Sequence, residues 1–200
     1  MDWNAILIAL RDFFSARDGR AMVAACAVMT ATGKTPPDRA SGLPQAADEL
    51  EYAFNRLFVG PGVVVAPPYA SVYLDPDCRL MGESTRRAAA VYDALGLSSS
   101  FDEELPYDHL ALELDAVLAF RVLGAQDQSA ELDALWHYFL HDHLACWLPL
   151  FTAKVMQAPA PLHPEISRAI AFLSAWLAAA IKDLPQESLP MTHQPGGTAA

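Results

Sequence analysis

The sequence predicts an all-α fold, built as a single-domain helical bundle of about eight or nine helices. Over most of the chain, apolar residues recur at the three- and four-residue spacing of an amphipathic helix. No segment alternates strongly between apolar and polar residues, as a half-buried strand would. The 200 residues, 53% hydrophobic and 18% charged, suffice for one domain with a sizeable core but not for two large ones. We expect the domain to cover residues 1–185.

The first part of the chain predicts three helices. Residues 2–32 have a helical pattern, and the Asp18-Gly19 pair predicts a break that makes two helices of it. Residues 33–45 (GKTPPDRASGLPQ) are rich in Gly and Pro and predict a loop. Residues 46–58 predict the next helix, because their large apolar side chains fall at helical spacing.

The middle of the chain contains one unusual segment. Residues 60–74 (GPGVVVAPPYASVYL) enclose an apolar stretch between prolines and glycines, which predicts an extended, packed connection rather than a helix. After a turn near residues 75–77, residues 83–95 predict a helix that stops at Gly96. Residues 98–106 predict a polar, acidic linker.

Three further segments complete the predicted bundle. Residues 108–123 carry an apolar stripe at helical spacing. Residues 127–144 predict a helix that is bent or broken before Pro149. Residues 164–184 predict the last helix, with proline in its first turn. The polar tail, residues 186–200, is predicted to be disordered.

The charge of the chain limits the classes of partner. Thirteen Lys and Arg against 24 Asp and Glu give a formal net charge of −11. This balance excludes nucleic acid as a partner, since its binding depends on cationic contacts to phosphates, and it offers nothing to anionic lipid. Residues 88–153 alone carry eleven acids and one base. Such a field attracts cationic partners, although a solvated acidic surface is the alternative interpretation.

Targeting and redox features predict a cytoplasmic protein without stable membrane insertion. Arg11 and Asp12 interrupt the apolar start that a secretory signal needs. The longest uncharged run, residues 57–74, holds prolines and glycines and cannot be a continuous membrane helix. The three cysteines form no CxxC pair, which favours reduced thiols in the cytosol.

Motifs for catalysis are incomplete. Residues 33–35 (GKT) resemble the end of a phosphate-binding P-loop, but Val28 stands where the first glycine is needed. His137 and His141 have the spacing of zinc ligands on a helix, but Tyr138 replaces the glutamate of a zinc protease. No GxSxG motif marks a nucleophile. The sequence therefore predicts a protein that is not an enzyme and has no cofactor or metal.

Three blocks remain that these exclusions do not touch: residues 51–74, residues 95–97, and residues 106–114 (PYDHLALEL). Asp108 stands at the start of a predicted helix, where a carboxylate can cap the helix and favour the positive end of its dipole. A ligand-binding carboxylate is the alternative, and the residues by themselves leave both roles open.

The blocks, in this order and spacing, resemble the TorD/DmsD family of cytoplasmic chaperones that mature molybdenum-containing redox enzymes. The similarity extends over about residues 50–180, and Tyr69 stands where several relatives have Trp. The matching motifs are Arg56-Leu57-Phe58-Val59-Gly60-Pro61, Pro67-Pro68-Tyr69-Ala70-Ser71-Val72-Tyr73-Leu74, Gly96, Pro106-Tyr107-Asp108-His109 and His143-Leu144-Ala145-Cys146-Trp147-Leu148-Pro149.

The resemblance implies an all-helical, TorD-like fold and a binding function. Members of the family bind the N-terminal twin-arginine signal peptide of an apo molybdoenzyme and hold the enzyme back from export until its cofactor is inserted. A holdase that grips the mature apoenzyme, rather than its leader, is the alternative. The signal-peptide site implied by the resemblance, with Ser71 and Val72 added from the same motif, is Tyr69, Ser71, Val72, Tyr73, Gly96, Pro106, Asp108 and His109.

Physical chemistry suggests the form of such a site. A twin-arginine signal joins a cationic pair to an apolar segment, so its receptor would be an apolar groove flanked by carboxylates. Tyr69, Val72 and Tyr73 would be rigid anchors, with ordinary core positions as the alternative for the two tyrosines. Asp108 would pair with an arginine in a bidentate fork. We expect a monomer, or a dimer swapped about a hinge at residues 98–106.

Overall fold

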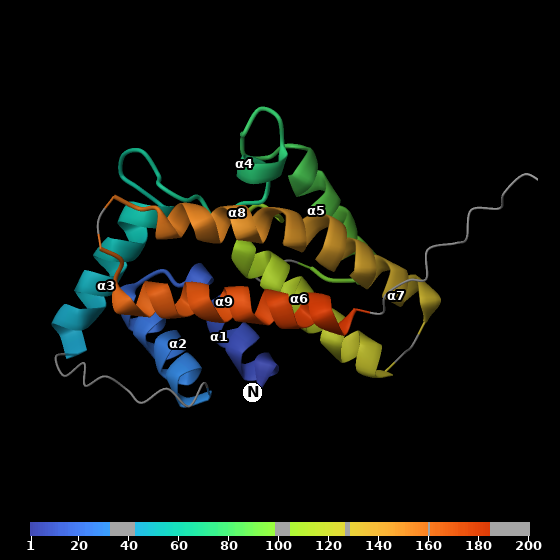
Figure 1. The fold of residues 1–200 in the computed structure, drawn as a ribbon, viewed down its shortest axis with the longest axis horizontal. Coiled ribbons are helices and arrows are strands. Elements are labelled where there is room, and N and C mark those ends of the chain that lie inside the picture. Colours follow the sequence, from blue (N-terminus) through green and yellow to red (C-terminus); the bar gives the residue numbers. More distant parts are fainter. Residues whose placement is uncertain (33–42, 99–104, 127–128, 160, 185–200) are drawn as a thin grey trace, which may run out of the picture.

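The computed structural model describes residues 1–32, 43–98, 105–126, 129–159 and 161–184, and these residues form helices and connections without a strand (Figure 1). The predicted all-α fold and helix number are confirmed. The expected tail disorder, most of the proposed hinge and most of the first loop concern residues outside the described ranges. The elements are α1 (Trp3–Ser15), α2 (Gly19–Thr32), α3 (Leu43–Phe58), α4 (Ser71–Leu74), α5 (Glu83–Ala94), α6 (Leu110–Gln126), α7 (Ala130–His137), the π-helical segment η1 (Tyr138–Leu144), α8 (Ala145–Met156) and α9 (Pro164–Asp183).

The break between α1 and α2 lies at the predicted Asp18-Gly19 pair. Asp18 Oδ1 accepts a hydrogen bond from Ala21 N at 2.8 Å and so caps the start of α2. A Cβ atom at Gly19 would lie 2.1 Å from the backbone oxygen of Ala47, so only glycine allows α2 to approach α3 this closely. The Gly19 amide donates to Glu51 Oε2 at 2.7 Å, which fixes the same contact.

Aromatic side chains fill the core where α1, α3 and α8 meet. Phe14 contacts Phe54, Phe58 and Phe151 with ring centroids 5.7 to 6.2 Å apart, mostly edge to face. α8 and α9 lie side by side across α1 and α6 (Figure 1). This arrangement places α4 and α5 on one long side of the molecule, where α4 contacts α8 and α5 contacts α6 (Figure 1).

The predicted bend before Pro149 takes a different form. Residues 130–156 stay helical throughout, and Pro149 lies exposed inside α8. The irregularity is η1, where the helix widens to π geometry immediately before α8. A proline ring crowds the carbonyl four residues earlier, at Ala145, which is where the π segment joins α8. The chain thus accommodates the proline by a local change of helix geometry rather than by a break.

Residues 60–70 form an irregular connection, as expected, but the prediction was wrong for its last residues, which form the short helix α4. The turn is stabilised at its first residue, because the Ser71 amide donates to the side chain of Asp108. This partner is distant in sequence, so the pattern of residues 60–74 contains no sign of it.

α9 is the one described helix that is long and apolar enough to cross a membrane, by length and composition, and a third of its most apolar window is buried. Its apolar face contacts α8 and α1 in the core through residues that include Ile166, Ile170, Leu173 and Trp176.

Candidate functional site

Two of the predicted motifs lie side by side in the fold. Tyr69 and His109 form an isolated antiparallel bridge, in which Ala70 N donates to Asp108 O at 3.0 Å and Leu110 N donates to Pro68 O at 2.9 Å. The rings of Tyr69 and His109 meet edge to face with centroids 4.9 Å apart. The start of α6 and the segment before α4 therefore form one structural unit.

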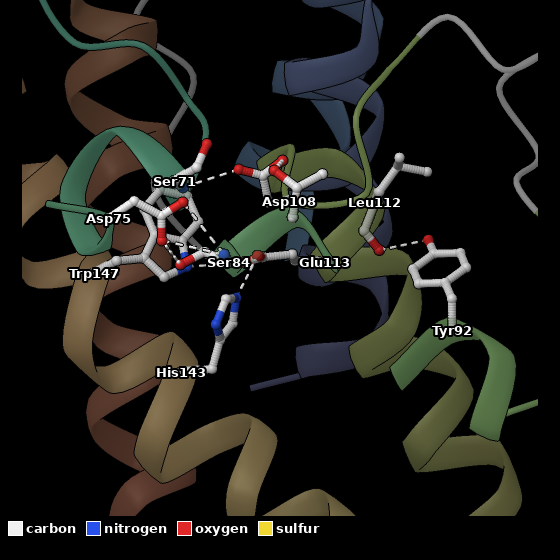
Figure 2. Close-up of polar contacts among 10 residues, drawn as sticks. Ser71, Asp75, Ser84, Tyr92, Asp108, Leu112, Glu113, His143 and Trp147 are labelled. Carbon is white, nitrogen blue, oxygen red and sulfur yellow. Dashed lines mark hydrogen bonds and ion pairs between the residues drawn. The ribbon is translucent and has the colours of Figure 1, made fainter. Parts of the chain in front are cut away.

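Asp108 points into this unit and has no exposed surface. Its Oδ2 atom accepts a hydrogen bond from Ser71 N at 2.9 Å, and its Oδ1 atom accepts one from Thr85 Oγ1 at 2.8 Å. Figure 2 shows the carboxylate turned toward Ser71. The structure thus differs from the capping interpretation, because the Asp108 carboxylate bonds to Ser71 and Thr85 rather than to its own helix, and a ligand-binding role stays a prediction.

His109 takes the capping role instead. Its Nδ1 atom accepts a hydrogen bond from Ala111 N at 3.1 Å, in the first turn of α6. Burial lowers the pKa of His109 to about 4, and the nearby Asp108 opposes this shift only weakly. The imidazole is therefore neutral at pH 7, as an acceptor at Nδ1 requires.

A cavity of about 560 Å³ opens beside the Tyr69–His109 bridge. Tyr69, Val72 and His109 form part of its wall. The remainder comes from the end of α1 and the two residues after it, from α3, from the connections on either side of α4, and from Leu105. The lining is mostly apolar, and the described residues that form it are Phe14, Ser15, Ala16, Arg17, Phe54, Phe58, Val59, Val64, Pro67, Pro68, Tyr69, Val72, Cys78, Leu80, Leu105 and His109.

The predicted carboxylate rim is absent from this cavity as far as the structure describes it. Arg17 is the charged side chain among the lining residues, and no Asp or Glu is one of them. Asp108 is close to Tyr69, but its side chain turns inward and accepts a hydrogen bond from the first amide of α4. The apolar part of the expected site is present, whereas its acidic part is not found among the residues that the structure describes.

Ser71 and Tyr73 belong to the core rather than to the cavity wall. Tyr73 stacks on Trp147 with centroids 5.8 Å apart and contacts Phe151 edge to face. Lys154 Nζ lies 5.9 Å from the centre of the Tyr73 ring. Burial raises the pKa of the Tyr73 hydroxyl. These contacts of Tyr73 pack α4 against α8. Ser71 and Tyr73 therefore lie behind the residues that line the cavity.

Gly96 and Pro106 form turns at the edges of the site. Gly96 has a φ of +65°, and its neighbour Leu97 donates to Tyr92 O at 3.0 Å, which together end α5 in the manner common for glycine. The Pro106 carbonyl accepts from His109 N at 2.9 Å and so shapes the turn before α6. Neither residue is among those described as lining the cavity.

Sequence reasoning missed a buried polar cluster next to the site. Glu113 Oε2 accepts from Trp147 Nε1 at 2.9 Å, and Glu113 Oε1 lies 2.5 Å from His143 Nε2 (Figure 2). Burial raises the pKa of Glu113, and His143 opposes this only in part. Burial acts to lower the pKa of His143, but the Glu113 carboxylate outweighs it and the pKa is raised. A glutamate within the apolar run 110–114 was the available signal.

The comparison with protein families now gives the classification. Residues 22–153 match the model of the family described as nitrate reductase delta subunit. The chain belongs to this family. The relatives of this chain include proteins named as TorD and DmsD chaperones, so the resemblance seen in the sequence is confirmed.

Three relatives show the extent of the similarity. The chaperone protein TorD of Psychrobacter sp. is 35% identical over 116 residues, covering 56% of this chain and 51% of that protein. TorD of Vibrio cholerae is 32% identical over 113 residues, with 54% and 51% covered. The Tat proofreading chaperone DmsD of Salmonella typhimurium is 31% identical over 94 residues, with 46% and 45% covered. The chain spans about half the length of these relatives.

A solved structure supports the fold. The crystal structure of an Archaeoglobus fulgidus protein described as a redox enzyme maturation protein superimposes with a TM-score of 0.58. It is 20% identical, and the match covers 90% of this chain and 94% of that one. At this identity the likeness establishes the all-α architecture alone.

Proposed function

We propose that this chain is a cytoplasmic chaperone that binds the twin-arginine signal peptide of an apo molybdenum redox enzyme and holds the enzyme until its cofactor is inserted. It acts by binding and without turnover chemistry. Relatives named TorD and Tat proofreading chaperone DmsD support this assignment.

The observation that carries the proposal is the cavity beside the Tyr69–His109 bridge. Two motifs that are far apart in sequence supply its wall, through Tyr69 and Val72 on one side and His109 on the other. A volume of about 560 Å³ lies in the usual range for ligand sites, about 300 to 1,000 Å³. It is large enough for a few apolar side chains of a leader, but not for the whole segment.

The surface around the cavity extends its apolar character. Val59 and Leu80 line the cavity and are 62% and 50% exposed. Val63 and Met81, neighbours of lining residues in sequence, are also largely exposed. An apolar segment lying across the opening would bury these side chains, which favours an extended apolar ligand over a small polar one.

The acidic charge of the chain contributes to the long-range attraction of a cationic leader rather than to contacts inside the cavity. Most of the net charge of −11 comes from residues 88–153. The field of this region raises the encounter rate of a doubly cationic leader and weakens with salt. Because the described lining contains no carboxylate, the apolar segment is the part of the leader that we assign to the cavity.

Calorimetric titration with synthetic leaders of the host's molybdoenzymes tests the proposal. We expect a dissociation constant in the micromolar range or below for one leader, and about a tenfold loss with Tyr69→Ala, the size of one anchoring aromatic contact. Tyr52→Ala is the matched control, since Tyr52 is 72% exposed and is not a lining residue. An absence of binding to every leader, combined with binding to a leaderless apoenzyme, would replace signal recognition by the holdase alternative.

A further inference from the structure

The position of Asp108 raises the question of how it serves the site. Its side chain is 0% exposed, and both carboxylate oxygens accept hydrogen bonds from other parts of the chain. One donor is the first amide of α4, at Ser71, and the other is the hydroxyl of Thr85 in the first turn of α5. Asp108 therefore joins three segments: the turn before α6, the start of α4 and the start of α5.

The residues held by Asp108 are the neighbours of the cavity wall. Ser71 lies between Tyr69 and Val72 in the chain, and both of these line the cavity. The backbone bonds from Ala70 to Asp108 and from Leu110 to Pro68 fix the preceding residues of the same strip. Any shift of the Ser71 peptide would therefore move two lining side chains together.

The start of α5 is anchored to the end of α4 by a second contact. Asp75 Oδ1 accepts from Ser84 Oγ at 2.6 Å and from Ser84 N at 3.1 Å. A Cβ at Gly82 would lie 1.9 Å from Asp75 Oδ2, so this turn is closely packed. Ser84 and Thr85 thus tie α5 to both ends of α4, which gives Thr85 a fixed position from which to hold Asp108.

A direct role for Asp108 in binding arginine conflicts with these contacts. To reach a ligand the carboxylate would have to leave both donors, and the Ser71 amide and Thr85 hydroxyl would remain buried without a partner. The cavity wall described above contains His109 and Tyr69 but not Asp108. The carboxylate lies behind this wall.

We infer that Asp108 and Thr85 are positioning residues, which hold the first peptide of α4 so that Tyr69 and Val72 face the cavity, and that Asp108 does not pair with the arginines of the ligand. The inference rests on the proposed function for its binding assay. The inference distinguishes charge from geometry, because what matters at position 108 is a pair of hydrogen bonds, to the Ser71 amide and the Thr85 hydroxyl, rather than a negative charge.

Four variants test this inference in leader titrations. Asp108→Asn keeps an amide oxygen for Ser71 N and an amide N–H that can donate to Thr85, so we expect affinity within about threefold of the native protein and an unchanged salt dependence. Thr85→Ser keeps the hydroxyl and should behave alike. Asp108→Ala and Thr85→Val each remove a buried bond, and we expect about a tenfold loss for both.

An ion pair between Asp108 and the leader predicts the opposite pattern. Asp108→Asn would then weaken binding as much as Asp108→Ala and flatten the salt dependence, while Thr85→Val would have little effect. That result would overturn the inference. Should the native protein bind no leader at all, the proposed function fails, and the inference is judged by the following measurement.

Amide hydrogen exchange at Ser71 tests the positioning role without a ligand. We expect faster exchange in Asp108→Ala and Thr85→Val and native-like protection in Asp108→Asn and Thr85→Ser. Far-UV circular dichroism of each variant controls for loss of fold. If Asp108→Ala and Thr85→Val do not fold, Asp108→Asn and Thr85→Ser still test the inference. Loss of Ser71 protection in a folded Asp108→Asn protein would refute it.

Discussion

The buried pair of Glu113 and His143 should make stability fall as the pH rises above neutrality. The pKa of both groups is raised in the folded protein, so the pair retains a proton that the unfolded chain releases above the ordinary histidine pKa of 6.5. A raised pKa contributes stability that is complete below the unfolded value and is lost as the pH increases toward the folded value. The expected loss therefore begins near pH 4.5 through Glu113 and near pH 6.5 through His143, and it extends upward from each value.

The size of this effect follows from one proton. With an unfolded histidine pKa near 6.5, retention of one proton costs at most about 1.5 to 2 kcal/mol of stability between pH 6.5 and 8.0. For an unfolding slope of about 2 kcal/mol per molar urea, the midpoint falls by at most about 0.8 M. Urea unfolding followed by circular dichroism at several pH values in this interval measures it.

A double variant isolates the pair from other titrating groups. Replacing Glu113→Gln and His143→Gln removes both titrating groups, while the amide oxygen at position 113 can still accept from Trp147 Nε1. We expect the native protein to lose stability relative to this variant over the interval, by up to about 1.5 kcal/mol. Parallel stability curves for the two proteins would refute the retained proton.

Two further predictions concern His109 and the glycines. The lowered pKa of His109 contributes stability that is lost as the pH falls from 6.5 toward 4, so urea unfolding should show a loss of about 2 kcal/mol between pH 7 and pH 5. The His109→Asn variant should not show this loss, and its side chain can still cap α6. Gly19→Ala should cost about 2 kcal/mol or more, because its Cβ would meet the Ala47 carbonyl. Gly124→Ala is the matched control, because position 124 lies in open space on α6, and we expect it to gain about 0.5 kcal/mol. Thermal melts of the two variants measure both changes.

Local signals in the sequence predicted the helices well, for physical reasons. The Asp18-Gly19 pair contains a cap and a glycine that a close helix contact requires, so the break at this point was visible in two residues. Gly96 likewise ends α5 through its own positive φ. Information of this kind is contained in neighbouring residues, and periodicity supplies the remainder.

The orientation of the site residues could not be predicted in the same way. Asp108 finds its donors at Ser71 and Thr85, far away in sequence, and nothing local distinguishes an inward carboxylate from an outward one. The same holds for the cavity wall formed by Phe14 and Phe54, which a helical pattern marks only as core. The motifs predicted a candidate site, and tertiary contacts determine which of their side chains line the cavity.

The π-helical segment η1 changes the rotational orientation of α8 relative to α7 within one long helix. A π turn holds an additional residue, so everything after it is rotated by about 100° relative to a continuous α-helix. Trp136 and Phe139 meet Phe120 near one end of α6, while His143 and Trp147 reach Glu113 near its other end. Deleting a single residue from η1 would restore a continuous α-helical repeat. The helix could then keep its contacts with Phe120 or its contacts with Glu113, but not both.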